Sequence, residues 1–392
     1  MRSADRGATL RIALISSSYA PHIGGVEEHV AQVARALHAH GHVVEVWTVD
    51  RGVRPQPADP DAGRPADPFP VRYLPTPLPA RTLPALLRFA MTGAGARRRW
   101  RAAARDLRPD VLVVQCFGPN GVYALGLHRS TGLPLVVVSH GETLGDDNSV
   151  FARSRQLRSA LRESLAVASA HAAPSRYVLD DLSERFGAGE GTIIPNGVGP
   201  LPTFPAVERQ EDLVVAVGRL GWMKGFDLLI DAFARLDAGR LEIVGDGPER
   251  EALQQRIDRA GQQDRIQLLG ARDAAGVAER IAAAAVVVVP SRSESFGIVA
   301  LEAWRGGAAL LMTSRGGAAE FVRDGEDGLL VDPVDVAALS TAISGLLADA
   351  GLRERLTVAG AKRVGAFSWP RVALLYETML GAIVRRERRG PR

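Results

Sequence analysis

The sequence predicts an α/β protein with two doubly wound domains, each built like a Rossmann fold. Short β-branched runs alternate with amphipathic helical stretches along most of the chain, which is typical of parallel sheets covered on both faces. The 392 residues are too many for one core of ordinary size. A turn-forming stretch rich in Pro and Gly at residues 195–205 separates two halves. We therefore expect an N-terminal domain of residues 1–197 and a C-terminal domain of residues 198–369.

Strands are expected where apolar, β-branched residues run together between turn signals. In the first half these runs are Arg11–Ser16, Val43–Val49, Val111–Gln115 and Leu135–Ser139. In the second half they are Leu213–Val217, Leu241–Val244, Ile266–Leu268, Val286–Val289 and Ala309–Thr313. The amphipathic stretch Val26–His40, stopped by Gly41, has the length of a crossover helix between the first two strands. Ligands of such sheets bind beyond the carboxyl ends of the strands, so we expect the two domains to face each other across a deep cleft.

Composition excludes several classes of protein. The net charge is only +4, and the run Arg97–Arg101 is interpreted as a solvated helix face, so nucleic acid is not an expected partner. Cys116 is the only cysteine, which rules out an intrachain disulfide and predicts a small buried thiol. The first apolar run, residues 10–15, lacks a cleavage site, and no run reaches the length of a membrane span. We expect a cytoplasmic protein, with membrane association not favoured.

The segment from Pro290 to Glu302 is the most informative part of the chain. It follows a predicted buried strand and leads into a predicted helix at residues 300–304. Such a turn presents free backbone N–H groups and the positive end of a helix dipole, which suit an anion. Glu294 and Glu302 flank this turn and cannot bind an anion themselves, but they can accept hydrogen bonds from hydroxyl groups. The ligand is therefore expected to carry phosphate and sugar together.

A second set of candidates follows the strand Leu213–Val217. Arg219 and Lys224 stand before a predicted helix at residues 226–233, where cations suit a pyrophosphate. Only two of the 48 basic residues are lysines, so a lysine kept at position 224 indicates a need for a compact ammonium group. Gly245-Asp246-Gly247 follows the next strand and is expected to shape the nucleotide pocket.

The first domain offers fewer signals. The pair Gly24-Gly25 opens a predicted helix, where a ligand reaches backbone N–H groups without a Cβ in the way. His140 ends the strand Leu135–Ser139 and is a candidate for chemistry because of that position. Asp59-Pro-Asp61 has the form of a metal motif but is interpreted as solvated loop, so neither a metal site nor a cofactor is expected.

Together these segments resemble the retaining GT-B glycosyltransferases of family 4. The resemblance runs from Gly24-Gly25 to Phe367-Ser-Trp369, and its most specific part is a Glu-x7-Glu motif at Glu294 and Glu302. Gly316-Gly317-Ala-Ala-Glu320 and the run Asp327–Pro333 match the stretch that follows this motif in the family. By the same resemblance, the last helix, about residues 370–385, packs back on the first domain.

The resemblance implies a role for each matching position. Gly25 would approach the donor phosphate, Arg219 and Lys224 would bind the pyrophosphate, and Glu302 would hydrogen-bond the ribose. His140 would contact the transferred sugar near the reacting carbon. The groups implied for the sugar hydroxyls are Glu294 and the backbone of Phe296, Gly297 and Ile298. The catalytic set is therefore His140, Glu294, Arg219 and Lys224, and transfer would proceed with retention and without a metal.

The donor is expected to be a nucleotide sugar, with UDP as the nucleotide and a hexose or amino-hexose as the sugar. For the acceptor we expect His22, Glu142, Asp146 and Asp147 to contribute, which suits an amine-bearing aminocyclitol or aminoglycoside intermediate of bacterial antibiotic biosynthesis. The cluster Arg153, Arg155, Arg158 and Arg162 instead suits a lipid- or inositol-phosphate acceptor of envelope biosynthesis. Rivals of another class are a nucleotide-sugar epimerase, a phosphorylase and a nucleotide-sugar sensor. A monomer or homodimer is expected.

Overall fold

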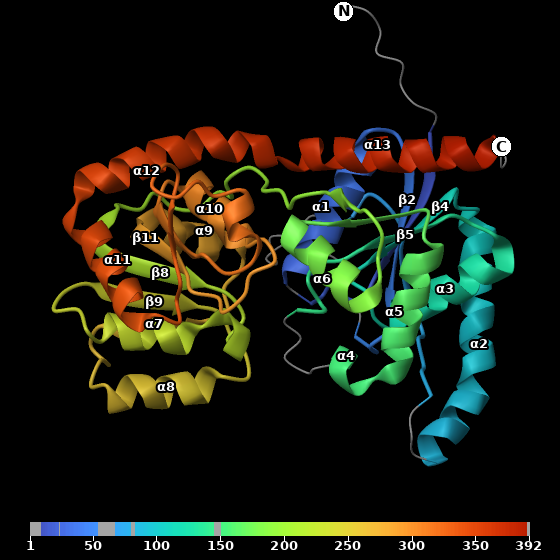
Figure 1. Cartoon of the computed structure of the whole chain (residues 1–392), viewed down its shortest axis with the longest axis horizontal. Coiled ribbons are helices and arrows are strands. Elements are labelled where there is room, and N and C mark those ends of the chain that lie inside the picture. Colours follow the sequence, from blue (N-terminus) through green and yellow to red (C-terminus); the bar gives the residue numbers. More distant parts are fainter. Residues whose placement is uncertain (1–8, 23, 54–66, 80–82, 145–149, 390–392) are drawn as a thin grey trace, which may run out of the picture. The chain divides into compact units, whose positions relative to one another are not determined.

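The computed structural model describes residues 9–22, 24–53, 67–79, 83–144 and 150–389. The chain divides into two units (Figure 1). The first ends at Pro195 and also takes in the C-terminal segment from Trp369, and the second runs from Asn196 to Ser368. Each unit is an α/β layer structure with its own sheet and its own apolar cores.

The first unit contains a parallel sheet of seven strands within the described residues, in the order β3-β2-β1-β4-β5-β6-β7. All neighbouring strands pair in parallel. Apolar, β-branched sequences such as VLVVQ of β4 form its centre, where strands are buried on both faces. The strands are β1 (Arg11–Ser16), β2 (Val43–Val49), β3 (Val71–Leu74), β4 (Val111–Gln115), β5 (Leu135–Val138), β6 (Ala170–Ala173) and β7 (Thr192–Ile193).

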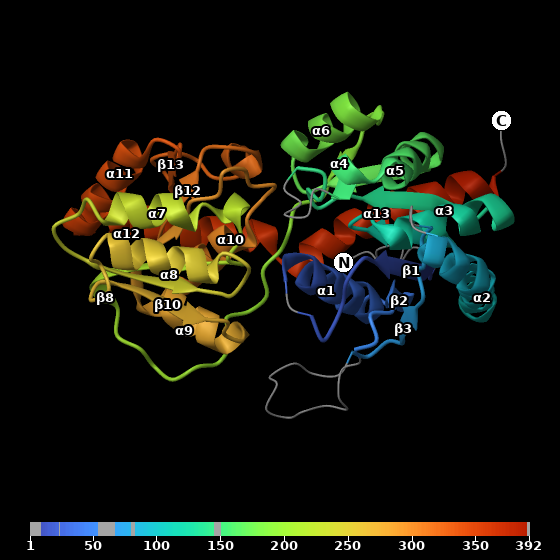
Figure 2. The ribbon, with the colours of Figure 1, turned by 90° about the horizontal axis from the view of Figure 1, so that it is seen from below.

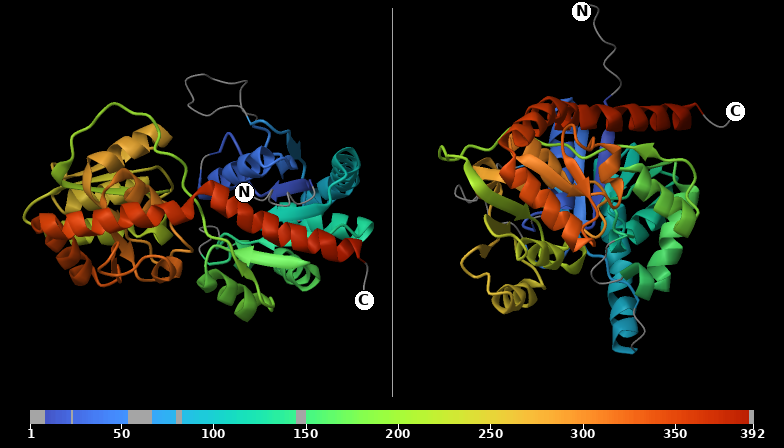
Figure 3. Two further views of the ribbon diagram at one scale, coloured as in Figure 1. Left: turned by 90° about the horizontal axis from the view of Figure 1, so that it is seen from above. Right: turned by 60° about the vertical axis from the view of Figure 1, so that its left-hand side comes forward.

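Helices cover both faces of this sheet. On one face, α1 (Gly25–Ala39) lies beside the C-terminal helix α13 (Trp369–Arg388), and both contribute to one apolar cluster with the strands (Figure 3). The opposite face carries a second apolar cluster. The helices that contribute to it are α2 (Leu83–Leu107), α3 (Pro119–Thr131), α4 (Val150–Arg153), α5 (Arg155–Val167) and α6 (Arg176–Phe186).

The second unit repeats the plan with a parallel sheet of six strands among the described residues, in the order β10-β9-β8-β11-β12-β13. Its apolar clusters again lie on the two faces, one with α7, α8 and α11 and one with α9 and α10 (Figure 2). The strands are β8 (Gln210–Val217), β9 (Arg240–Val244), β10 (Ile266–Gly270), β11 (Ala284–Val289), β12 (Ala309–Thr313) and β13 (Leu329–Val331). The helices are α7 (Phe226–Phe233), α8 (Arg250–Arg259), α9 (Ala274–Ala283), α10 (Ile298–Gly306), α11 (Val336–Ala348) and α12 (Ala350–Arg363), with 3₁₀ turns η2 (Trp222–Lys224), η3 (Gly317–Glu320) and η4 (Val364–Phe367).

The strand orders place a topological switch point in each sheet. In the first sheet β1 pairs with β4, and in the second β8 pairs with β11, although each pair is distant in sequence. The loops after these strands therefore leave the same edge of the sheet side by side, which is where ligands of doubly wound sheets bind. Every catalytic candidate from the sequence follows a strand at or next to such a point.

The predicted strands are all present, with ends that differ by a few residues. The sequence did not predict β3, β6, β7 and β13, which are short. The thiol prediction was partly wrong, because Cys116 is half-buried and not fully enclosed. It lies one residue beyond β4, with a φ of +56° where the chain turns out of the sheet. The run around Arg97 is a solvated helix face as predicted, with only Trp100 turned into the core.

Candidate functional site

In the second unit, two side chains singled out by the sequence form an ion pair at the switch point. Lys224 ends η2, which follows β8, and Glu294 lies in the loop after β11. The Nζ atom of Lys224 is 2.7 Å from Oε2 of Glu294. The Lys224 side chain is 38% exposed and that of Glu294 only 10%. Solvent therefore reaches the Lys224 side chain, while that of Glu294 is largely enclosed.

The Glu294 carboxylate is held by one of its oxygens. Oε2 accepts a hydrogen bond of 2.8 Å from the Ser291 hydroxyl in addition to the Lys224 contact. Oε1 forms no hydrogen bond with any residue that the structure describes. A carboxylate fixed in this way presents a hydrogen-bond acceptor in a defined position, as recognition of a hydroxyl group requires.

The loop that carries Lys224 lies directly against the loop that carries Glu294. Gly225, with a φ of +66°, ends η2, and a Cβ there would lie 2.1 Å from the carbonyl oxygen of Pro290. The Gly-Asp-Gly turn after β9 makes a similar approach, since a Cβ at Gly245 would lie 1.9 Å from the carbonyl oxygen of Gly218. These glycines allow three loops to pack backbone against backbone.

Arg292 fastens the two loops together. Its guanidinium donates to both carboxylate oxygens of Asp227, at 2.8 and 2.6 Å, and to the carbonyl oxygen of Trp222 at 2.6 Å. The same group lies 4.5 Å from the centre of the Trp222 ring, and the Arg292 backbone N–H donates to the Met223 carbonyl oxygen. Burial raises the pKa of Asp227, but the hydrogen bonds and charge of Arg292 outweigh burial and hold that pKa below its ordinary value.

The backbone around Glu294 is held by the loop after β12. Its N–H donates to the Arg315 carbonyl oxygen at 3.1 Å, and its carbonyl oxygen accepts from the Gly317 N–H at 2.8 Å. Gly316 has a φ of +101°, and a Cβ there would lie 2.2 Å from the Glu294 carbonyl oxygen. The match of Gly316-Gly317 noted in the sequence thus has a physical reason, because only glycine permits this contact.

The helix after Glu294 begins without a side-chain cap. Gly297, with a φ of +91°, is the N-cap of α10, and Gly225 is the N-cap of α7; neither helix start is capped by a side chain. Their first N–H groups are therefore suited to an anion. Phe296 is buried and stacks on Phe321 with ring centres 4.2 Å apart, and this packing fixes the turn before α10. Glu302 is half-buried on α10.

Arg219 shares the β8–α7 loop with Lys224 and is exposed. Lys224, Glu294, Gly297 and Ile298 are thus brought to the end of β8 and β11, as expected from the sequence. Gly25, His22 and His140 belong to the first unit. Asp146 and Asp147, and the Asp59 to Asp61 motif, lie outside the described residues.

In the first unit, His140 follows β5 and is one end of a chain of hydrogen bonds. Its Nε2 is 2.8 Å from Oε1 of Gln115, and Nε2 of Gln115 donates to the Tyr376 hydroxyl at 3.1 Å. That hydroxyl is 2.9 Å from Nε2 of His29, whose ring meets the His140 ring edge to face at 4.6 Å. Burial, together with repulsion from His29, lowers the pKa of His140 well below its ordinary value.

Glu142, expected at the acceptor, is engaged with its own loop. One carboxylate oxygen accepts from the Phe117 N–H at 2.7 Å, and the other accepts from the His140 N–H at 2.7 Å and the Ser139 hydroxyl at 2.9 Å. Burial raises the pKa of Glu142, against the effect of these hydrogen bonds. The carboxylate therefore ties the loop after β5 to the loop after β4 and fixes the backbone at His140.

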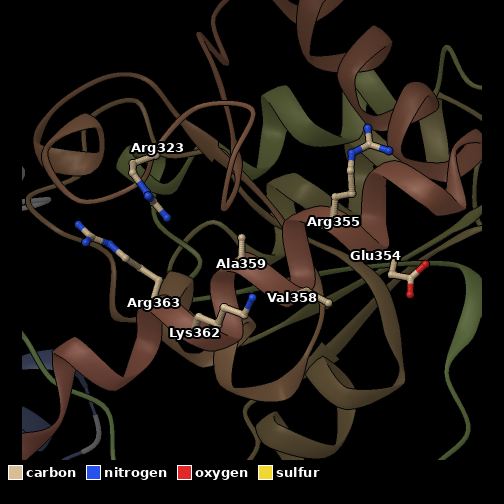
Figure 4. A pocket seen from close by; sticks show the side chains of 7 residues that line it. All are labelled: Arg323, Glu354, Arg355, Val358, Ala359, Lys362 and Arg363. Carbon is tan, nitrogen blue, oxygen red and sulfur yellow. The ribbon is translucent and has the colours of Figure 1, made fainter.

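A hollow of about 640 Å³ lies elsewhere on the second unit and contains none of the predicted site residues (Figure 4). Its lining is Arg323, Glu354, Arg355, Val358, Ala359, Lys362 and Arg363. Among the described residues, no group of three or more His, Cys, Asp or Glu side chains is placed to hold a metal ion.

Three residues of these sites were missed in the sequence. Arg292 stands inside the Pro290–Glu302 segment, but nothing local shows that its partner is Asp227. Gln115 had a usable signal, since it is a polar residue at the carboxyl end of an otherwise apolar strand. Tyr376 had no local signal, because the resemblance placed the last helix on the first domain but singled out no side chain of that helix, which packs beside α1.

Two family models match the chain, one in each half. Residues 23–200 match the model described as Glycosyltransferase Family 4, and residues 204–363 match the model described as Glycosyl transferases group 1.

Similarity to known proteins extends over nearly the whole chain. Phosphatidyl-myo-inositol mannosyltransferase of Mycobacterium leprae is 29% identical over 384 residues, covering 91% of this chain and 93% of that protein. Glycogen synthase of Mycobacterium tuberculosis is 29% identical over 410 residues, covering 97% of this chain and 96% of that protein. Among solved structures, sucrose-phosphate synthase from Thermosynechococcus elongatus matches with a TM-score of 0.77 at 25% identity, covering 97% of this chain and 99% of that one. The predicted two-domain α/β fold is confirmed by this match.

Proposed function

We propose, from the premise that the chain is a group 1 glycosyltransferase with the GT-B fold, that it transfers a hexose or amino-hexose from a nucleoside diphosphate sugar with retention. One observation carries the proposal. Lys224 and Glu294 come together at the switch point of the second sheet, beside two helix starts without side-chain caps. A cation and free N–H groups suit the diphosphate, and the fixed carboxylate beside them suits a sugar hydroxyl.

The leaving group sets what the site must do. As the bond between the anomeric carbon and the phosphate oxygen breaks, negative charge grows on the diphosphate. Lys224, Arg219 and the N–H groups at the start of α7 and α10 would stabilise this charge where it develops. We propose that these cations and dipoles take the part that a metal ion plays in other transferases.

The proposed stereochemistry follows from the role that we assign to Glu294. Double displacement requires a carboxylate within covalent reach of the anomeric carbon. Glu294 is tied through Oε2 to Lys224 and Ser291, and we assign it to the sugar hydroxyls. The acceptor oxygen would then attack from the face that the phosphate leaves, and the leaving phosphate oxygen would take the acceptor proton.

For the acceptor we propose a small polar, amine-bearing molecule, with His22, Glu142, Asp146 and Asp147 in the acceptor region of the first unit. Glu142 would act mainly by holding the backbone of His140, because both of its oxygens are engaged there.

A lipid acceptor is the second candidate, and the surface of α2 favours it. Leu86, Leu87 and Met91 are 44, 57 and 83% exposed, and exposed arginines follow at residues 97–99 on the same helix. Exposed apolar side chains followed by arginines suit an anionic membrane surface. No single helix among the described residues has the length and apolarity to cross a membrane.

The test is a screen of nucleotide sugars for protection against thermal unfolding, followed by turnover assays. A ligand at a hundred times its Kd should stabilise the protein by about 2.7 kcal/mol. Turnover is then measured with aminocyclitols and with phosphatidylinositol vesicles, and the anomer of the product is determined. Isomerisation of the donor without an acceptor would indicate an epimerase, and protection without any turnover would indicate a sensor. An inverted product would refute the proposed mechanism.

A further inference from the structure

Four polar side chains from four separate elements meet in the core of the first unit. They are His29 of α1, Gln115 of β4, His140 after β5 and Tyr376 of α13. His29, Gln115 and Tyr376 are almost completely buried, with exposures of 1, 0 and 0%. Buried polar groups are stable only when they are paired, so this chain of hydrogen bonds constrains all its members.

The amide of Gln115 decides where the protons lie. Its Oε1 can only accept and its Nε2 can only donate. Because Oε1 is 2.8 Å from Nε2 of His140, that nitrogen must carry the proton. Nε2 of Gln115 donates to the Tyr376 hydroxyl. That hydroxyl donates its single proton to Nε2 of His29, which is 2.9 Å away, because Oε1 of Gln115 is farther away at 3.4 Å.

His140 is thereby left with an unprotonated Nδ1. Within the described residues this atom forms no hydrogen bond. Burial and the neighbouring His29 keep the pKa of His140 low, so the ring stays neutral at physiological pH. Burial also raises the pKa of Tyr376, so its hydroxyl remains protonated and continues to donate. The groups that face the ring are His29 from α1 and Gln115 from β4. The Glu142 carboxylate of the same loop contacts His140 through its backbone N–H.

We propose that Tyr376 and Gln115 are positioning residues for sugar transfer, which keep His140 neutral with Nδ1 as an acceptor for a hydroxyl group of the substrate. The inference rests on the proposed function of His140, and it assigns to α13 a part in the reaction. Tyr376 reaches the chain only because α13 packs beside α1 in the first unit. The last helix of the chain thus sets the protonation of a residue that follows a strand more than two hundred positions earlier.

The tautomer of His140 is the direct test. Long-range ¹H–¹⁵N spectra of the whole protein, labelled at histidine, distinguish a proton on Nε2 from one on Nδ1. The wild type should show His140 protonated on Nε2. Tyr376→Phe removes the hydroxyl that orients Gln115, so the amide can turn over and the Nδ1-protonated form should become populated. Tyr123→Phe is the matched control, because that hydroxyl donates to the Pro77 carbonyl oxygen at 2.8 Å in the same unit.

Kinetics give a second readout. Tyr376→Phe should lower kcat about two- to tenfold, the rate equivalent of one hydrogen bond, while Tyr123→Phe should leave kcat unchanged. Gln115→Glu places a carboxylate against His140 and should raise the pKa of its ring. A protonated His140 ring has no nitrogen left to accept a hydrogen bond. The rate of sugar transfer by this variant should therefore fall at acidic pH and recover at higher pH, whereas the rate of the wild type should not change over the same range.

A wild-type His140 protonated on Nδ1 would overturn the proposal. So would a Tyr376→Phe protein that matches Tyr123→Phe in both tautomer and kcat, or a Gln115→Glu pH profile like that of the wild type. The tautomer is measured without substrate, so it remains decisive for the proton arrangement if no sugar transfer is found. In that case the proposed function fails, and the spectra still decide whether Tyr376 sets the tautomer.

Discussion

Replacing Arg292 with alanine should loosen the loop that presents Lys224. Arg292 joins the loop after β11 to η2 and to the first turn of α7 through Asp227 and Trp222. Without it, Asp227 keeps a half-buried negative charge that has lost its partner, and the carbonyl oxygen of Trp222 loses a donor. We expect lower stability of the second unit and a higher KM for the sugar donor, because Lys224 ends η2.

The size of the effect follows from the exposure of the pair. The side chains of Arg292 and Asp227 are 15 and 27% exposed, between the surface pairs that contribute about 0.2–1 kcal/mol and the buried pairs whose disruption costs about 3–5 kcal/mol. A loss of about 2–3 kcal/mol is expected, which lowers Tm by about 4–12 °C for a domain of this size class. The low pKa of Asp227 sets the pH dependence: its contribution is present above the unfolded pKa of about 3.9 and is lost as the pH falls through the folded value. The difference between variant and wild type should therefore be full at pH 7 and shrink below about pH 4.

Calorimetric unfolding and donor kinetics test this prediction. Arg240→Ala is the matched control, because Arg240 also donates to both oxygens of an aspartate, Asp212, but both side chains are exposed. That variant should lose less than about 1 kcal/mol. If Arg292→Ala is no less stable than Arg240→Ala and its donor KM is unchanged, the assigned role of Arg292 is refuted.

Two further predictions concern single positions. Gly316→Ala should destabilise the second unit and impair donor binding, because its Cβ would clash with the Glu294 carbonyl oxygen. Gly325→Ala is the control: Gly325 has a φ of +75°, but nothing lies within 4 Å of a Cβ there, so this variant should show only the backbone strain. Equal losses of stability in urea unfolding would contradict the proposed clash at Gly316. His140 is kept neutral in the folded chain, so the unfolded chain takes up one more proton below about pH 6.5 and stability should fall as the pH is lowered towards 5.5. His140→Gln should make that fall shallower by up to about 1.4 kcal/mol per pH unit, and an unchanged slope in unfolding experiments would show that His140 is not involved.

The sequence was sufficient where a local pattern determines structure. Val-rich runs such as β11 predicted the central strands, and the composition singled out Lys224. Short strands such as β6, with the sequence AHAA, lack that pattern and form only because a longer-range neighbour, here β5, pairs with them.

Contacts across the sheets were beyond local reasoning. The ion pair of Lys224 with Glu294 requires that β8 and β11 be neighbours, and the chain from His140 to Tyr376 requires that α13 return to the first unit. Neither adjacency is written in the spacing of the residues themselves.

The most direct test of the proposed donor site is a calorimetric titration of UDP into three proteins. Lys362→Ala is the control, because Lys362 is the other lysine of the chain and lines the hollow of Figure 4, which contains none of the predicted site residues. The wild type and Lys362→Ala should bind UDP equally, and Lys224→Ala should bind it about ten- to a hundredfold more weakly, as expected for the loss of a charged hydrogen bond of about 1.5–3 kcal/mol. Equal binding by Lys224→Ala, or no binding of UDP or any other nucleoside diphosphate by the wild type, would contradict the account.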